Sequence, residues 1–307
     1  MPSVTFKLKP RPPFRLDLTV QALRRRPFNI VDRFDAGTWR RVILVGRAPV
    51  GVTVVQTRQG AHPEIEVTVD APHPSGVKEQ VAAIVTRMLG LELDLSDFYR
   101  LARRDRTLAA LADPLRGLKP VRYPTVFEGF ANAVAGQLVS LSAGMHVLNR
   151  LTDALGTVRR FDGVTMHSFP SANLVARADP EMLRAAGLSR PKAAYLIGIA
   201  RLAMNAKDPD FGSVAALDDA AAVAHLSQIH GVGRWTSEYV LLRGFGRIHI
   251  FPGDDVGGRN KLLELLDRRD RADYDAVHRI VARWHPYAGL VYLHLVVSGA
   301  VTRVEDD

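Results

Sequence analysis

Two adjacent carboxylates, Asp254 and Asp255, follow a glycine turn, Gly231 to Gly233, in the segment 226–255. The segment reads as a helix, a tight turn, a second helix and a loop. The glycines leave backbone N–H groups bare at the start of the second helix, where partial positive charge favours a bound phosphate group. We therefore expect the turn to bind one phosphate and the loop to deliver a carboxylate beside the bound strand.

The position of the two aspartates also has a plain structural explanation. One of them is expected to be the N-cap of the helix that starts after Asp255. A carboxylate at a helix N-terminus also suits chemistry, because it could stabilise a cationic, oxocarbenium-like sugar or align a water against it. Both interpretations can hold, one for each aspartate.

Apolar residues near this segment allow two interpretations each. Trp235 and Tyr239 are four residues apart and share one helix face, where they could sandwich a flat base or simply pack in a core. The neighbouring turn and Asp255 favour the base. Leu138 follows a helix break at Gly136-Gln137. It is either a core residue or an exposed wedge that enters the DNA stack where a base has left.

Composition narrows the class of protein. The 307 residues include 41 Lys and Arg against 32 Asp and Glu, a formal charge of +9, which is typical of a nucleic-acid binder but also of ribosome-associated and membrane-surface proteins. The absence of cysteine excludes disulfides, thiolate zinc sites and iron–sulfur clusters. The ten histidines show no metal-ligand spacing. Without a transmembrane run or a signal peptide, we expect an intracellular, nucleoid-associated protein.

The elements that must position these residues predict an α+β fold. Residues 1–115 are expected to form an antiparallel-sheet α+β domain, with a hairpin over 40–56 turning at Ala48-Pro49 and a strand over 64–70. Helices are predicted over 18–25 and 76–91. The arginine run Arg24-Arg25-Arg26 is interpreted as a solvated face.

Residues 116–307 are predicted to be all-helical, because apolar residues recur at helical spacing throughout. Asp179-Pro180 and Gly187 mark the start and stop of one helix. The predicted helices cover 125–154 with a break at Gly136, 180–187, 191–205, 220–229, 234–243, 257–267, 273–284 and 287–299.

The motifs LSQIHGVGRWTSEYVLLRG (226–244) and FPGDD (251–255) resemble the helix–hairpin–helix and catalytic-aspartate loop of the HhH-GPD DNA glycosylase superfamily. The likeness is greatest to its 3-methyladenine DNA glycosylase II (AlkA-type) branch. It extends through FEGFANAVAGQLVS (127–140) and GLSRPKAAYLIGIA (187–200), and more weakly through 12–29. The resemblance implies a helix–hairpin–helix motif at about 220–243, a catalytic loop at 250–258 and an active-site cleft between helical subdomains.

The resemblance also implies a role for individual residues. Asp255 matches the catalytic aspartate, Leu138 the intercalating wedge, and Trp235 and Tyr239 the aromatic walls of the base pocket. In relatives the hairpin anchors a DNA phosphate and holds a monovalent cation through backbone carbonyls, which implies a structural Na⁺ or K⁺ here. No cofactor and no catalytic metal are expected. The matching hairpin residues are His230, Gly231, Val232, Gly233, Arg234 and Thr236.

The implied activity is that of a monofunctional glycosylase that hydrolytically excises purines of the 3-methyladenine and 7-methylguanine type and leaves an abasic site. Trp235 stands where bifunctional relatives carry a lysine, so no lyase activity is expected. The expected partner is damaged double-stranded DNA, bound by a monomer. No association with a membrane is expected.

Three alternatives stay open: a glycosylase of the same fold for deaminated or oxidised bases, a non-catalytic DNA-binding protein, and an RNA- or ribosome-binding protein. The first gains weight because Ala22 and Val296 stand where the best-known member has further pocket aromatics. The tail at 304–307 has no evident role.

Overall fold

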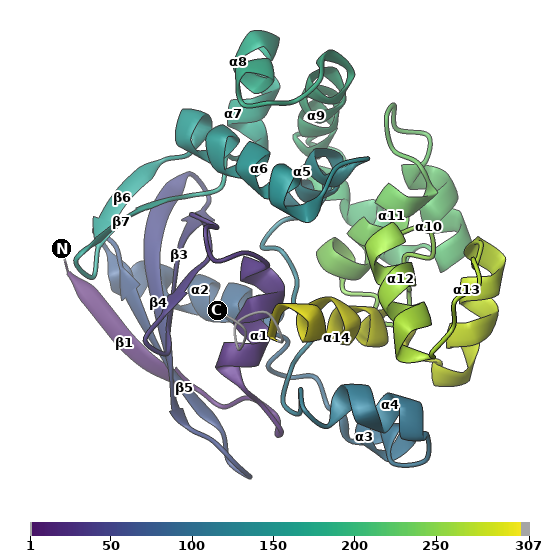
Figure 1. Ribbon diagram of the computed structural model, residues 1–307. Helices are drawn as coiled ribbons and strands as arrows, with labels where there is room; N and C mark the ends of the chain where they lie inside the picture. Colours follow the sequence, from purple (N-terminus) through teal and green to yellow (C-terminus); the bar gives the residue numbers. More distant parts are fainter. Residues whose placement is uncertain (1, 302–307) are drawn as a thin grey trace.

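The structure, a computed structural model, describes residues 2–301, so the tail at 304–307 lies outside the described residues. A β-sheet forms one side of the molecule and a helical assembly the other (Figure 1). This arrangement confirms the predicted α+β class. Among the described residues, no helix combines the length and apolar character needed to cross a membrane.

The sheet is antiparallel with strand order β1-β5-β4-β3-β2, and α1 and α2 share a hydrophobic core with it. The predicted 40–56 hairpin is confirmed, but it turns at Gly46-Arg47 rather than Ala48-Pro49, because Val45 pairs with Ala48 and Gly46 takes a φ of +62°. Strands β1 and β2 were not predicted. The elements are β1 (Ser3–Leu8), α1 (Leu16–Arg24), β2 (Arg33–Asp35), β3 (Thr38–Val45), β4 (Ala48–Arg58), β5 (Glu64–Asp70) and α2 (Pro74–Met88).

Helices dominate the rest of the chain. They are α3 (Ser96–Ala102), α4 (Arg106–Ala112), α5 (Val126–Gly136), α6 (Leu141–Leu155), α7 (Ala172–Arg177), α8 (Pro180–Ala185), α9 (Arg190–Ala203), the 3-10 helix η1 (Pro209–Ala216), α10 (Asp219–Leu226), α11 (Arg234–Val240), the π-helix η2 (Leu241–Phe245), α12 (Val256–Leu265), α13 (Tyr274–Val281), the 3-10 helix η3 (Ala282–Trp284) and α14 (Ala288–Val301).

The prediction that everything after residue 115 is helical is wrong at one place. A β-hairpin of β6 (Val158–Phe161) and β7 (Val164–His167) interrupts the helices. Its two-residue turn, Asp162-Gly163, has positive φ at both positions, the conformation that an Asp-Gly pair favours between two strands. Phe161 lies directly against Gly51 of the sheet, where any Cβ would fall 2.6 Å from its ring.

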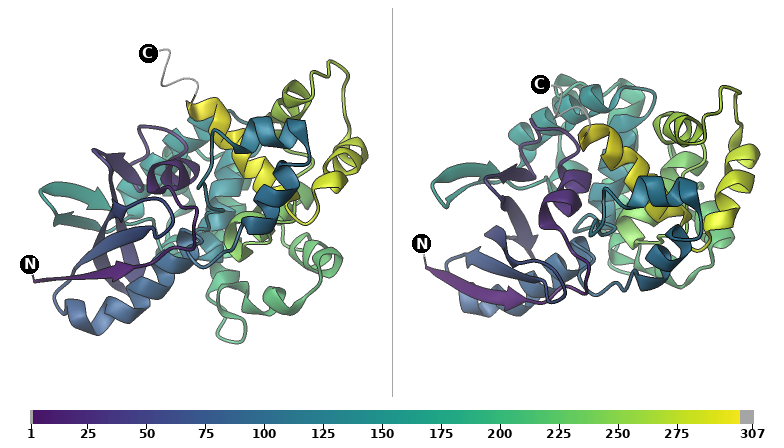
Figure 2. Two further views of the ribbon diagram at one scale, coloured as in Figure 1. Left: turned by 90° about the horizontal axis from the view of Figure 1, so that it is seen from below. Right: turned by 60° about the horizontal axis from the view of Figure 1, so that its bottom comes forward.

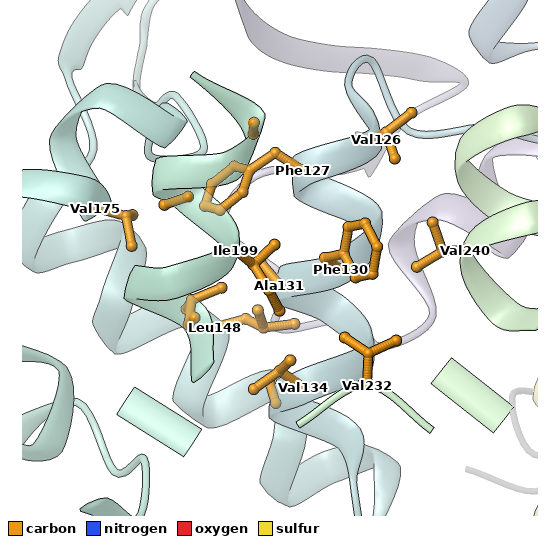
Figure 3. Packing of buried hydrophobic residues seen from close by; sticks show 14 of the residues in the cluster. Val126, Phe127, Phe130, Ala131, Val134, Leu148, Val175, Ile199, Val232 and Val240 are labelled. Carbon is orange, nitrogen blue, oxygen red and sulfur yellow. The ribbon is translucent and has the colours of Figure 1, made fainter. Parts of the chain in front are cut away.

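Helix α5 is the centre of the helical core, and its residues from Val126 to Ala135 are all buried. Figure 3 shows Phe130 beside Val240 of α11, and Val134 beside Val232 of the glycine turn. The other face of α5 packs against α6 and α9. Because α5 ends at Gly136, this packing sets where Leu138 lies relative to the turn.

Two further features fix the two parts of the molecule together. Helix α14 packs against α1, α4 and α12, and Figure 2 shows it between the purple α1 and the blue α3–α4 pair. The guanidinium of Arg41 is buried between two carboxylates, 2.7 Å from Asp32 on the segment before β2 and 2.6 Å from Glu128 on α5. A buried cation needs such partners, and loss of Arg41 would leave two buried carboxylates without their counter-charge.

Candidate active site and DNA interface

Asp255 lies half-buried at the junction of the catalytic loop and α12. It is the N-cap of α12, and its Oδ1 accepts the backbone N–H of Gly258 at 2.6 Å. Its Oδ2 accepts the indole N–H of Trp235 at 3.0 Å. The expectation that one aspartate caps a helix is confirmed. The roles are not divided between the two, however, because Asp255 is both the cap and the carboxylate beside the aromatic residues.

Asp254 is instead part of an ionic and aromatic cluster on the outer side of the loop. It accepts the Nε–H of Arg234 at 2.8 Å, and the Arg234 guanidinium lies 3.5 Å from the ring centre of Tyr274. This pairing restrains the loop without bringing Asp254 toward Trp235 or Tyr239.

Trp235 and Tyr239 form one continuous aromatic surface rather than two facing walls, but only Trp235 is partly exposed. Tyr239 is buried with Tyr123 and Ala133, so the interpretation as a core residue is confirmed for Tyr239. The Trp235 and Tyr239 ring centres are 5.7 Å apart with a 33° tilt between the planes. Aromatic rings in direct contact have centres roughly 4.5–7 Å apart, so the two rings pack on each other and leave no room for a base between them.

Three further residues lie beside this surface: Tyr123 and Arg25 at the Tyr239 hydroxyl, and Tyr292 near Asp255. The Tyr239 hydroxyl lies 2.9 Å from the Tyr123 hydroxyl and 3.4 Å from Nη1 of Arg25. Tyr292 is buried against the first turn of α12, where a Cβ on Gly258 would fall 2.5 Å from its ring. Burial, and then the charge of Asp255, raise the pKa of Tyr292 well above its usual value.

Little in the sequence around these three residues indicates a place in the site. Tyr123 precedes the proline at the start of α5, and Tyr292 lies in the apolar helix α14. Arg25 belongs to the run Arg24-Arg25-Arg26 interpreted as a solvated face, an interpretation that is wrong because all three side chains are half-buried. By contrast, Ala22 is buried in the N-terminal core and Val296 packs against the core beneath α14.

Leu138 is fully exposed, with a relative accessibility of 104% and a φ of +57°. The interpretation as a core residue is therefore excluded. Its neighbour Gln137 fixes the segment, since Nε2 donates to the carbonyl of Gly231 at 3.0 Å and to Oγ1 of Thr236 at 3.1 Å. Lys192 donates to the Gln137 carbonyl at 2.6 Å. The segment that carries the exposed leucine is thus bonded to the glycine turn through Gln137.

The glycine turn has the geometry that its two glycines allow. Gly231 has a φ of +84°, and a Cβ there would fall 2.2 Å from the Tyr195 ring, so only glycine fits. His230 packs edge-on against that same ring at 4.7 Å, and Val232 is buried. Gly233 is the N-cap of α11 and offers no side chain to its first N–H groups, which leaves them available to a ligand.

Glu238 connects α11 to the loop that carries Asp255. Its carboxylate, 4% exposed, accepts the Gly253 N–H at 3.2 Å and the Tyr274 hydroxyl at 2.5 Å. Burial raises the pKa of Glu238 to about 7. This buried acid was not selected from the sequence, where it is one charge in an amphipathic helix.

The described residues contain no group of three or more histidine, aspartate or glutamate side chains that could hold a metal ion. The monovalent cation implied by the resemblance would need backbone carbonyls. Those of Ile229 and Gly231 each accept one hydrogen bond, from the Val232 N–H and from Gln137. Each carbonyl therefore keeps a second lone pair, so the turn is compatible with such an ion.

Comparisons with known proteins identify the family and the fold. The chain is 27% identical to the DNA-3-methyladenine glycosylase of Bacillus subtilis (strain 168), over 83% of this chain and 84% of the relative. It is 28% identical to DNA-3-methyladenine glycosylase 2 of Escherichia coli (strain K12), over 55% and 56%. A solved 3-methyladenine DNA-glycosylase from Archaeoglobus fulgidus shares the fold, with a TM-score of 0.83, 23% identity, and coverage of 96% of this chain and 98% of that one. The family model of the HhH-GPD superfamily of base excision DNA repair proteins matches residues 131–287, and the chain belongs to that superfamily.

Proposed function

We propose that this protein is a monofunctional DNA glycosylase of base excision repair. It would hydrolyse the N-glycosidic bond of alkylated purines, of the 3-methyladenine and 7-methylguanine type, and leave an abasic site. The observation that carries the proposal is the contact of Asp255 with Trp235, which places a carboxylate at the edge of an aromatic surface. The names of the Bacillus and Escherichia relatives support the choice of lesion.

In the proposed mechanism the glycine turn holds a backbone phosphate, and the damaged nucleotide rotates out of the duplex. Leu138 fills the gap, since it projects fully exposed from a segment that is bonded to the turn. Flipping costs a few kcal/mol, less for a damaged base. The base stacks on Trp235 and Tyr239, which attract a cationic ring through their π faces.

Asp255 then acts on the sugar. Alkylation at N3 or N7 makes the purine a cationic leaving group, so the bond breaks with little help from an acid. The carboxylate stabilises the positive charge that develops on the sugar, or orients the water that adds to C1′. The purine departs with the electrons of the glycosidic bond, the water oxygen bonds to C1′, and one proton is released to solvent.

The same geometry supports hydrolysis without strand cleavage. A lyase needs an amine that attacks C1′. Trp235 supplies only an indole N–H, and that group already donates to Asp255. We expect borohydride to trap no covalent protein–DNA complex during turnover, and a trapped complex would contradict this part of the proposal.

The decisive experiment measures base release from methylated duplex DNA by the wild-type protein, Asp255→Asn and Asp254→Asn, with products separated by chromatography. Asp254→Asn is the matched control, because the neighbouring aspartate pairs with Arg234 instead of Trp235. We expect release of 3-methyladenine or 7-methylguanine by wild type and control, and at least a tenfold loss in Asp255→Asn with DNA binding retained. Turnover above a tenth of wild type in Asp255→Asn would refute the assignment of the catalytic residue.

We further infer that the protein acts on duplex DNA as a monomer, and that Na⁺ or K⁺ binds the free lone pairs of the turn carbonyls. Sedimentation of the complex with a short duplex tests whether the protein binds as a monomer, and the mass of a one-to-one complex is expected.

Replacement of K⁺ by a bulky organic cation at constant ionic strength tests the cation site. This replacement is expected to weaken DNA binding. Unchanged binding would contradict it.

A further inference from the structure

Arg25 brings a positive charge to the candidate base site. It directly follows α1 and has a φ of +55°, which directs the chain away from the helix axis. Its Nη2 donates to Oδ1 of Asn132 on α5, and its Nη1 lies 3.4 Å from the Tyr239 hydroxyl. The side chain thus extends from the N-terminal domain to the aromatic surface.

The hydrogen-bonding capacity of this guanidinium is only partly used. The Nε–H is buried and has no hydrogen-bond partner, and the contact with Tyr239 is long for a hydrogen bond. Within residues 2–301 no carboxylate forms an ion pair with Arg25. Asp32, whose charge raises the pKa of Arg25, is itself paired with Arg41. A buried charged donor without a full set of acceptors is costly, so a ligand that supplies an acceptor gains affinity.

The position of Arg25 indicates the chemical class of such a ligand. Tyr239 connects Arg25 to Trp235, and Trp235 contacts Asp255, so the cation and the carboxylate lie at opposite ends of one aromatic surface. A purine stacked on this surface with its glycosidic bond near Asp255 directs its far edge toward Arg25. That edge carries the exocyclic group at C6.

We propose that Arg25 is a specificity-determining residue that recognises a hydrogen-bond acceptor on the flipped base. The inference rests on the proposed glycosylase function and narrows its substrate class. A neutral purine with a carbonyl at C6, such as hypoxanthine, accepts from the guanidinium. A cationic purine with an amino group at C6, such as 3-methyladenine in DNA, offers no acceptor there and is repelled by the charge. The residue therefore shifts the lesion range from cationic toward neutral, carbonyl-bearing bases.

The test compares two single-turnover rates: release of hypoxanthine from a duplex with one hypoxanthine–thymine pair, and release of 3-methyladenine from methylated duplex DNA. The variants are Arg25→Met and the matched control Arg24→Met. The Arg24→Met substitution removes the same charge one residue away. The Arg24 guanidinium donates to the Pro27 carbonyl. For Arg25→Met we expect the ratio of hypoxanthine to 3-methyladenine release to fall by about tenfold or more, the range for hydrogen bonds to charged groups. For Arg24→Met the ratio should stay unchanged.

Arg25→Lys separates charge from geometry and serves if the methionine variant does not fold. Lysine keeps the positive charge but lacks the planar guanidinium that donates two parallel hydrogen bonds. The ratio of hypoxanthine to 3-methyladenine release is therefore expected to lie between those of wild type and Arg25→Met. An equal loss of both rates in the Arg25 variants would make the residue structural and overturn the inference. Wild-type release of 3-methyladenine but not hypoxanthine would overturn it while the proposed function stands. Release of neither base from DNA would overturn both.

Discussion

Glu238 allows a quantitative test of how the loop carrying Asp255 is held. Its buried carboxyl has a pKa raised from 4.5 to about 7, chiefly by burial. The folded protein therefore binds a proton at Glu238 more tightly than the unfolded chain does. Because the native state carries the extra proton between pH 4.5 and 7, the free energy of unfolding falls as pH rises through that window. The full effect is up to about 3 kcal/mol.

The perturbation is Glu238→Gln. A glutamine can keep both contacts, because its oxygen accepts the Gly253 N–H while its amide donates to the Tyr274 hydroxyl oxygen. It cannot ionise. We therefore expect the variant to be more stable than wild type by only about 1 kcal/mol near pH 5, where the unfolded chain has begun to ionise, and by roughly 3 kcal/mol at pH 8.

The assay is urea unfolding of both proteins at pH 5 and pH 8, with the difference between variant and wild type taken at each pH. This double difference removes the other titrating groups, which both proteins share. Glu181→Gln is the control, since this glutamate lies exposed on α8 and pairs only with its helix neighbour Arg184 in a surface ion pair. Parallel stability curves for Glu238→Gln and wild type would show that the carboxyl is not buried as the structure has it.

Three further substitutions test the candidate site. Trp235→Phe removes the 3.0 Å donor to Asp255, and we expect base release to fall about tenfold with retained DNA binding, measured in single-turnover assays. Leu138→Gly removes the strain of a positive φ at a residue with a Cβ. Thermal unfolding should therefore show stability that is unchanged or raised by roughly 1 kcal/mol, while excision from duplex DNA should fall. Gly231→Ala forces a Cβ into the Tyr195 ring, so we expect a loss of at least about 2 kcal/mol in stability and weaker binding to an abasic duplex.

The features predictable from the sequence were those with a local cause. The glycine turn, the N-cap at Asp255 and the β3–β4 hairpin each depend on a few neighbouring residues with strong conformational preferences. The same holds for one feature that was overlooked. Asp162-Gly163 between two short alternating segments is a strong hairpin signal, and the surrounding helical periodicity masked it.

The features that could not be predicted depend on contacts between distant segments. Arg25 and Tyr239 are separated by most of the chain, and nothing in an arginine run indicates which side chain turns inward. Tyr292 enters the site because α14 packs between α1 and α12. The exposure of Leu138 follows from where α5 ends, since the apolar residues around it suggest a core equally well.

The placement of the site follows from one rigid helix. Helix α5 is buried along its length and contacts α11, while the segment just after it is bonded to the glycine turn through Gln137. The exposed Leu138 and the proposed phosphate anchor therefore form one mechanical unit. A strand held at the turn lies at a fixed distance from the wedge, so flipping would require the DNA to deform rather than the protein. This arrangement favours lesions that already weaken stacking or pairing, since the cost of extrusion is lower for them. Arg25 would then act on the extruded base, a second selection that depends on chemistry instead of duplex stability.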